Sequence, residues 1–450
     1  MDGRARQRHD GDAEGFGKWQ AEIDPPKILC VGEQDQNDGV ETKGIDPLQS
    51  HRRLLKSFWD YSTAVGGYNA AMRIKGLDGL RAIAFLLVLL FHTRFGTFGW
   101  VGVQLFFVLS GFLITGILLD MKKHMTTGLY FVKFYGRRFF RIIPLYYLYL
   151  VLVVLLAVYL IETQNHKKYM LMLWDQLPFA AAYVYNFFMA TSLFQETFMF
   201  LTHLWSLAVE EQFYIVWPLF VFLIPFRHLK KAFWAAILLA PIFRLFVLWF
   251  YQTQSYEMMG DMYRAVYALP LSHVDAFACG ALLNLAPKIP KARLQFFILL
   301  PMLPLVGMLT DYLAVGQWNI ENSFGWALLL PTAYKSVWGY SLLNYVFMLL
   351  IHGVAREGWF VRFLEHAWMR YLGRISYGLY VYHYAVYWLV TQIIAPSADK
   401  YSGALLTLLF TVMIASLSFH LFERPIDRLK ERWFPVDTRQ RFQPDGELAR

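Results

Sequence analysis

Ten apolar runs dominate the chain, and each has about the length that a helix needs to cross a lipid bilayer. They are residues 79–98, 102–120, 142–161, 203–225, 232–251, 270–286, 295–312, 336–353, 374–395 and 403–421. An eleventh apolar stretch, 169–200, contains Asp175, Pro178 and Asn186, and we expect it to be re-entrant or to lie on the outer surface. The pattern predicts an all-α polytopic membrane protein with about ten transmembrane helices.

The segments outside these runs differ in composition. Residues 1–72 are polar and show no sustained apolar period, so we expect a disordered cytoplasmic tail there, followed by a membrane domain over 73–425. Residues 426–450 are expected to form a cytoplasmic C-terminal tail. Of the 450 residues, 57% are hydrophobic and only 17% are charged, which excludes an ordinary soluble enzyme.

The net charge of +9 does not indicate nucleic-acid binding, because the basic residues alternate between connecting segments. The segments 121–141, 226–231, 287–294 and 354–373 with Arg374 carry sixteen Lys and Arg residues, against six in the alternate segments. This asymmetry predicts that both termini lie in the cytoplasm. Membrane lipid is therefore an expected partner, nucleic acid is not, and the oligomeric state stays open.

The first polar cluster is Arg81 with His92 in the first apolar run. The eleven-residue separation places both on one helical face, roughly 16 Å apart along the axis. An imidazole inside a span is suited to proton transfer, but a histidine that hydrogen-bonds between helices is an equally good explanation.

The second cluster is the pair Arg138 and Arg141, which are helical neighbours beside the membrane. Two guanidinium groups can bind phosphate, although ordinary topology or lipid contact explains most such residues.

The third cluster is a stripe of Ser206, Glu210 and Tyr214, which recur every four residues. Carboxylates at the edge of an apolar run are costly, which favours a functional role. The neighbouring Glu211 is expected to point elsewhere.

The remaining buried polar residues are His273 with Asp275, Tyr380 with His383, and Arg244, for which structural roles are the more common explanation. No metal site and no soluble-enzyme motif is expected. The residues alone fit either a membrane enzyme or a transporter.

Taken together, these clusters resemble the integral-membrane acyltransferase-3 family, which O-acylates extracytoplasmic glycans. The resemblance rests on Arg81 and His92, on Gly102-Val-Gln-Leu-Phe-Phe-Val-Leu-Ser-Gly-Phe-Leu-Ile114, on the Arg-x-x-Arg of Arg138 and Arg141, and on Ser206 to Tyr214. Weaker matches are Asp275-Ala…Gly280, Ile375-Ser-Tyr…Tyr380-x-x-His383 and Phe422-Glu-Arg-Pro425. The resemblance covers about 73–425.

The resemblance implies an enzyme of the bacterial inner membrane that transfers an acyl group, usually acetyl. The donor would be acyl-CoA, used as a co-substrate with no permanently bound cofactor. The acceptor would be a hydroxyl of an extracytoplasmic glycan or lipid-linked sugar. Arg81, Arg138 and Arg141 are the expected phosphate ligands, and His92 is the candidate base or acyl carrier.

Ser206, Glu210 and Tyr214 are expected to orient His92 or the acceptor, with Glu210 as the charge partner of His92. A transporter or flippase-like translocator of acyl groups or lipid-linked sugars is the alternative, because buried charges suit a proton-coupled path too.

Overall fold

The computed structural model describes residues 74–253, 261–286, 288–316 and 323–435. The predicted N-terminal tail and most of the predicted C-terminal tail lie outside the described residues. Within them the chain forms helices and turns and no strand, as the sequence predicts. The α-helices are α2 (Leu77–His92), α3 (Val101–His124), α4 (Thr127–Glu162), α5 (Lys167–Ala181), α6 (Tyr185–Met189), α7 (Leu204–Leu223), α8 (Phe226–Thr253), α9 (Met262–Ala268), α10 (Val274–Leu282), α11 (Ala292–Val315), α12 (Lys335–Glu357), α13 (Val361–Leu364), α14 (Ala367–Arg374), α15 (Ser376–Leu389), α16 (Lys400–Ser418) and α17 (Arg424–Trp433).

Shorter helical turns link some of these helices. They are the 3₁₀ turns Thr97–Trp100 and Pro270–His273, and the π-helical turns Val390–Ile394 and Phe419–Glu423.

Each of the ten predicted apolar runs contains helix. Among the described residues, seven helices are long and apolar enough to cross a membrane, or eight if α9 and the bent segment Pro270–Leu282 form one broken span. The two remaining runs form α2, of 16 residues, and α15, of 14 residues. At 1.5 Å per residue both are shorter than a hydrocarbon core of about 30 Å. The multi-pass membrane class is confirmed, and the number ten stays a prediction.

The stretch 169–200 forms α5, the five-residue α6 and irregular turns. Neither helix is long enough to cross a bilayer alone, as expected for a segment that does not span.

The longest helix, α4, places the basic cluster. Its 36 residues rise about 54 Å, so its first half extends beyond a hydrocarbon layer of about 30 Å. That half carries Arg137, Arg138 and Arg141. The short helix α17, which the sequence did not predict, packs against it through a two-bond ion pair between Arg137 and Glu431. The predicted tail thus begins as a docked helix.

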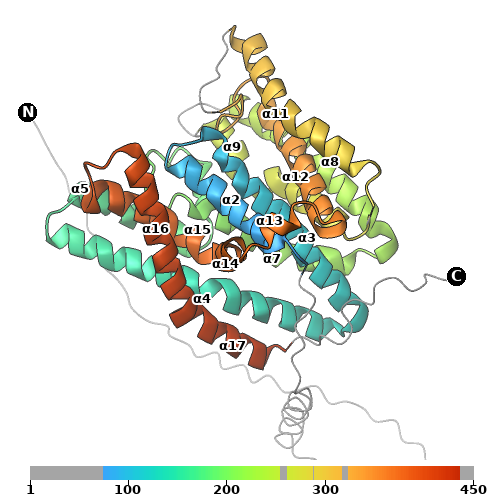
Figure 1. Cartoon of the computed structure of the whole chain (residues 1–450), viewed down its shortest axis with the longest axis horizontal. Coiled ribbons are helices and arrows are strands. Elements are labelled where there is room, and N and C mark those ends of the chain that lie inside the picture. Colours follow the sequence, from blue (N-terminus) through green and yellow to red (C-terminus); the bar gives the residue numbers. More distant parts are fainter. Residues whose placement is uncertain (1–73, 254–260, 287, 317–322, 436–450) are drawn as a thin grey trace, which may run out of the picture. The chain divides into compact units, whose positions relative to one another are not determined.

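Helix α3 lies at the centre of the bundle and contacts α2, α7, α10 and α12 (Figure 1). Two glycines permit its close crossing with α10. A Cβ atom on Gly111 would lie 2.1 Å from the carbonyl oxygen of Phe277, and one on Gly280 would lie 2.0 Å from that of Val108. Such distances exclude any side chain, so these glycines fix how near the two backbones lie.

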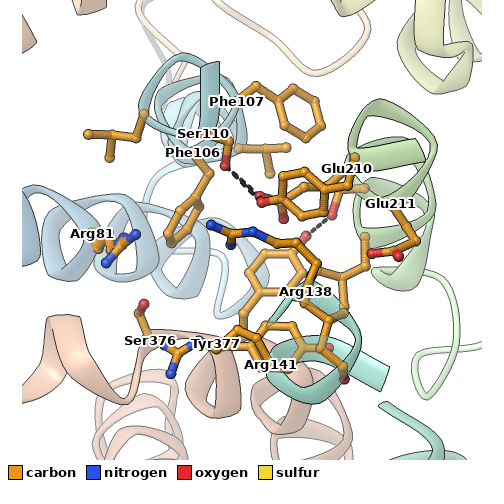
Figure 2. Close-up of a pocket in the computed structure, with 17 residues that line it drawn as sticks. Arg81, Phe106, Phe107, Ser110, Arg138, Arg141, Glu210, Glu211, Ser376 and Tyr377 are labelled. Atoms are coloured by element: carbon orange, nitrogen blue, oxygen red, sulfur yellow. Dashed lines mark hydrogen bonds between the residues drawn. The ribbon is translucent and has the colours of Figure 1, made fainter. Parts of the chain in front are cut away.

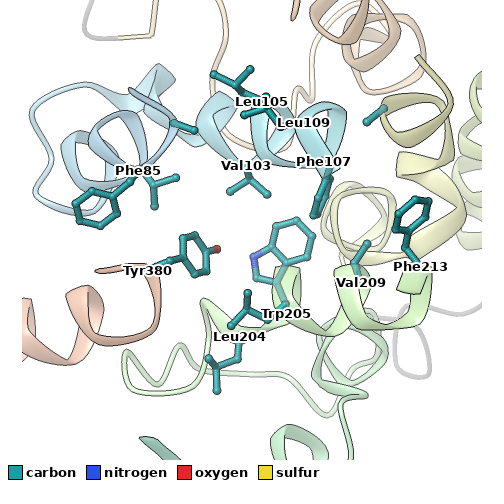
Figure 3. Close-up of a cluster of buried hydrophobic side chains, with 14 of the residues drawn as sticks. Phe85, Val103, Leu105, Phe107, Leu109, Leu204, Trp205, Val209, Phe213 and Tyr380 are labelled. Carbon is teal, nitrogen blue, oxygen red and sulfur yellow. The ribbon is translucent and has the colours of Figure 1, made fainter. Parts of the chain in front are cut away.

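Aromatic and aliphatic side chains from α2, α3, α7 and α15 fill the space beside α3 (Figure 3). Phe107 and Trp205 meet edge to face with ring centroids 6.4 Å apart. This buried cluster holds the polar faces of α3 and α7 toward each other at one end of the contact, where the candidate site lies.

Candidate active site

A cavity opens between α2, α3, α4, α7 and α15 and has an empty volume of about 870 Å³, its open mouth included. Six of the seven predicted site residues line it: Arg81, Arg138, Arg141, Ser206, Glu210 and Tyr214. Figure 2 shows Arg81 reaching in from α2, while Arg138 and Arg141 enter from α4.

The three arginines are cations with few partners. Arg138 makes no hydrogen bond or ion pair with any residue in the described ranges, and its guanidinium lies 5.2 Å from the ring centroid of Tyr214. Arg81 and Arg141 each have one carboxylate contact at 3.3 Å, to Asp78 and Asp427. Each guanidinium has five N–H donors, so most of them face the cavity or solvent without a protein acceptor. These unpaired N–H donors on positively charged groups could bind an anionic ligand.

A second cavity, with an empty volume of about 880 Å³, shares these three arginines with the first. Its lining adds Lys133, Arg137 and Lys430 from the basic end of α4 and from α17. The two spaces therefore adjoin at the arginines, with the more basic one on the side that the charge pattern predicts to be cytoplasmic.

The predicted stripe on α7 is formed, but it does not contact His92. Ser110 of α3 donates a 2.5 Å hydrogen bond to Glu210, and Tyr214 donates a second, very short one to the same oxygen. The expected pairing of Glu210 with His92 is therefore absent. Ser110 is not among the polar clusters identified in the sequence. Its position beside Gly111 in an otherwise apolar helix could have indicated that it contributes to the site.

Glu211 departs from its expected orientation. It lines the same cavity as Glu210, and its Oε2 atom is buried without a hydrogen-bond partner among the described residues (Figure 2). Glu210 and Glu211 are neighbours on α7, so their side chains point about 100° apart around the helix axis. Both still border the cavity, because a wide face of α7 lines it. The cavity therefore contains two carboxylates beside its three arginines.

His92 lies outside this cavity and has another histidine as its partner. Its Nδ1 atom is 2.8 Å from Nε2 of His383, and its ring stacks on Tyr384 with centroids 4.1 Å apart. His383 is fully buried. Sequence reasoning favours a structural role for His383, because nothing local connects it with His92.

Tyr380 connects the cavity with these histidines. It lines the cavity, its hydroxyl lies 2.5 Å from the Ser206 hydroxyl, and its ring centroid is 5.3 Å from that of His383. The ring of His203 packs against both Tyr380 and His383. A chain of contacts thus runs from Ser206 in the cavity lining through Tyr380 to His383 and on to His92.

The other buried polar groups have structural partners. Arg244 pairs with Asp275 at 3.0 Å with both side chains fully buried, and it also donates to Ser341 and to backbone carbonyls. His273 is bonded on both ring nitrogens, by the Gln104 amide and the Tyr267 carbonyl. These contacts agree with the structural roles expected for them.

These features define a multi-pass membrane protein with an arginine-lined cavity that leads toward a histidine pair. A family model described as an acyltransferase domain matches residues 74–422. The chain therefore belongs to the acyltransferase-3 family, and the resemblance drawn from its motifs is confirmed.

Several named relatives share this region. The chain is 27% identical over 370 residues to the peptidoglycan O-acetyltransferase OatA of Listeria monocytogenes, covering 78% of this chain and 56% of that protein. It is 31% identical over 364 residues to the putative peptidoglycan O-acetyltransferase YrhL of Bacillus subtilis, covering 78% and 55%. A putative O-acetyltransferase of Staphylococcus aureus is 26% identical over 387 residues, covering 80% and 58%.

The chain thus spans little more than half the length of these relatives. No solved structure matches it.

Proposed function

We propose that this protein transfers an acyl group, in the first instance acetyl, from acyl-CoA to a hydroxyl of an extracytoplasmic glycan or lipid-linked sugar. The observation that carries the proposal is a single cavity lined by three arginines with few protein partners and by the hydroxyl groups of Ser206 and Tyr380. Membership of the family and the activity for which its relatives are named support the reaction type. We further propose that the protein lies in the bacterial inner membrane, where acyl-CoA on one side and glycan on the other are both within reach, with both termini in the cytoplasm.

The shape and charge of the two cavities match the donor. CoA carries several phosphates at one end and a thin thioester arm at the other. The phosphates would contact Arg81, Arg138 and Arg141 from the basic second cavity, and the arm would extend into the first. Within the first cavity, the thioester would arrive near the hydroxyl groups of Ser206 and Tyr380.

In the proposed chemistry the acceptor hydroxyl loses its proton to His92 while its oxygen attacks the acyl carbon. The carbon–sulfur bond then breaks, and the CoA thiolate leaves and takes up a proton. Because Tyr380 lies between the cavity lining and His383, its side chain must shift for the acyl group to reach His92. Glu210, Ser110 and Tyr214 form a bonded unit that would position the donor arm and not the histidine.

The direct test uses purified protein, acetyl-CoA labelled in the acetyl group, and peptidoglycan fragments as acceptor. The proposal predicts labelled, alkali-labile ester on the glycan, formed only with the protein present. Labelled acetyl-CoA bound but never converted, or a glycan moved between compartments without esterification, would instead favour a translocator.

A further inference from the structure

The hydrogen bonds of His383 determine which ring nitrogen of His92 carries a proton. His383 is fully buried on α15, and its two ring nitrogens both have partners. Nδ1 lies 2.6 Å from the carbonyl oxygen of Tyr380, and Nε2 lies 2.8 Å from Nδ1 of His92.

A carbonyl oxygen only accepts hydrogen bonds, so Nδ1 of His383 must be the protonated nitrogen. A neutral imidazole has a single N–H, which makes Nε2 of His383 an acceptor. The hydrogen bond between the two rings is then donated by Nδ1 of His92. Consequently the neutral His92 ring has its lone pair on Nε2.

The Nε2 atom of His92 is therefore available to accept a proton. His92 makes no other hydrogen bond with the described residues, and the side chain is only partly buried. Its ring plane is held by stacking on Tyr384 at 4.1 Å and by the edge of Phe91 at 5.1 Å. Phe85 packs edge to face on His383, with centroids 5.9 Å apart, and fixes the second ring.

We propose that His383 is a positioning residue, which sets the tautomer and orientation of His92 so that Nε2 is the atom that takes the acceptor's proton. This inference rests on the proposed function, because it presumes that His92 is the base. In a Ser-His-Asp triad, a buried carboxylate orients the histidine and fixes its tautomer. Here a neutral imidazole, hydrogen-bonded to a backbone carbonyl, would have that role. The proton that arrives at Nε2 makes the ring an imidazolium and is then passed to the CoA thiolate.

His203, a further histidine whose ring packs against His383, cannot replace it. Nε2 of His203 lies 2.9 Å from the carbonyl oxygen of Val381, and Nδ1 of His203 has no partner among the described residues. The His203 ring meets His383 at 79°, edge to face, with centroids 5.3 Å apart. It therefore packs against the pair without entering its hydrogen-bond chain.

The test compares three variants of the full-length protein in the acetyl-transfer assay. His383→Leu fills the space but removes the acceptor for His92 Nδ1, and we expect kcat to fall about ten- to a hundred-fold, by analogy with the loss of the partners that orient metal-ligating histidines. KM for acetyl-CoA should change little. His383→Gln keeps an acceptor oxygen and should recover much of the lost kcat, which a purely space-filling role does not predict. His273→Gln changes a buried histidine outside the site and serves as the matched control, with kcat retained in folded protein.

Nitrogen-15 NMR of histidine-labelled protein supplies a readout that does not depend on turnover. The His92 signals, assigned by their loss in His92→Ala, should show a lone pair on Nε2 in the wild type and mixed tautomers in His383→Leu. A wild-type kcat in His383→Leu, or a lone pair on Nδ1 in the wild type, would overturn the inference. Activity surviving in His92→Ala would also overturn the inference, because it removes the base that the inference presumes. Absence of labelled ester from the wild-type protein would instead overturn the proposed function, so the two failures are distinguishable.

Discussion

Arg138 and Arg137 both line the second cavity but differ in their protein partners, which permits a sharp test of donor binding. Arg138 lines both cavities and has no acceptor among the described residues. Arg137 donates to both carboxylate oxygens of Glu431, at 3.0 and 2.6 Å, and to the backbone carbonyl of Phe434. We therefore predict that Arg138→Ala weakens acyl-CoA binding, whereas Arg137→Ala mainly loosens the docking of α17.

The expected magnitude follows from the hydrogen bond to phosphate that the substitution removes. A hydrogen bond to a charged group contributes roughly 1.5–3 kcal/mol. With one such bond to a phosphate, Arg138→Ala should raise the Kd for acyl-CoA roughly ten- to a hundred-fold. Arg141→Ala should show a similar or smaller effect, because Asp427 already occupies part of the Arg141 guanidinium at 3.3 Å.

The assay is titration of detergent-purified protein with acetyl-CoA by calorimetry, alongside KM from the transfer reaction. Neither Arg138→Ala nor Arg137→Ala should change the affinity for the glycan acceptor. If Arg138→Ala binds acetyl-CoA as the wild type does while remaining folded, the arginine cluster serves topology or lipid contact and the donor site lies elsewhere.

Three further predictions concern the scaffold. Gly280→Val should abolish recovery of monodisperse protein in detergent, because its Cβ would lie 2.0 Å from the Val108 carbonyl oxygen; wild-type yield would contradict the crossing of α3 and α10. Asp275→Asn should lower the thermal midpoint strongly, since breaking a buried ion pair costs about 3–5 kcal/mol, and an unchanged midpoint would refute a structural role for Arg244. Reporter fusions in 226–231 should report cytoplasm, whereas an external signal would mean that 169–200 crosses fully.

The sequence predicts those parts of the site that depend on local geometry. Arg138 with Arg141, and Ser206 with Glu210, are separated by three or four residues, so helical periodicity alone places each pair on one face. The apolar runs likewise predict the helices, because a bilayer requires long apolar segments with internally bonded backbones.

The pairings that join distant segments are not predictable in this way. His92 and His383 are 291 positions apart, and Ser110 and Glu210 are 100 apart. The first pair depends on the packing of α2 against α15 and the second on that of α3 against α7, and no local sequence pattern specifies either contact. The prediction for Glu211 is wrong because helical phase gives the direction of a side chain but not the width of the cavity it borders.

The central claim is that His92 acts as the base in acyl transfer, and the most direct measurement is the turnover of His92→Ala compared with its binding of acetyl-CoA. General-base loss typically reduces a rate by about 10²–10⁴. We predict a folded, membrane-inserted variant that binds acetyl-CoA with wild-type affinity but has lost turnover by at least that lower factor, with no recovery in His92→Gln. Near-native turnover in well-folded His92→Ala protein would contradict this role and direct the search to Glu210.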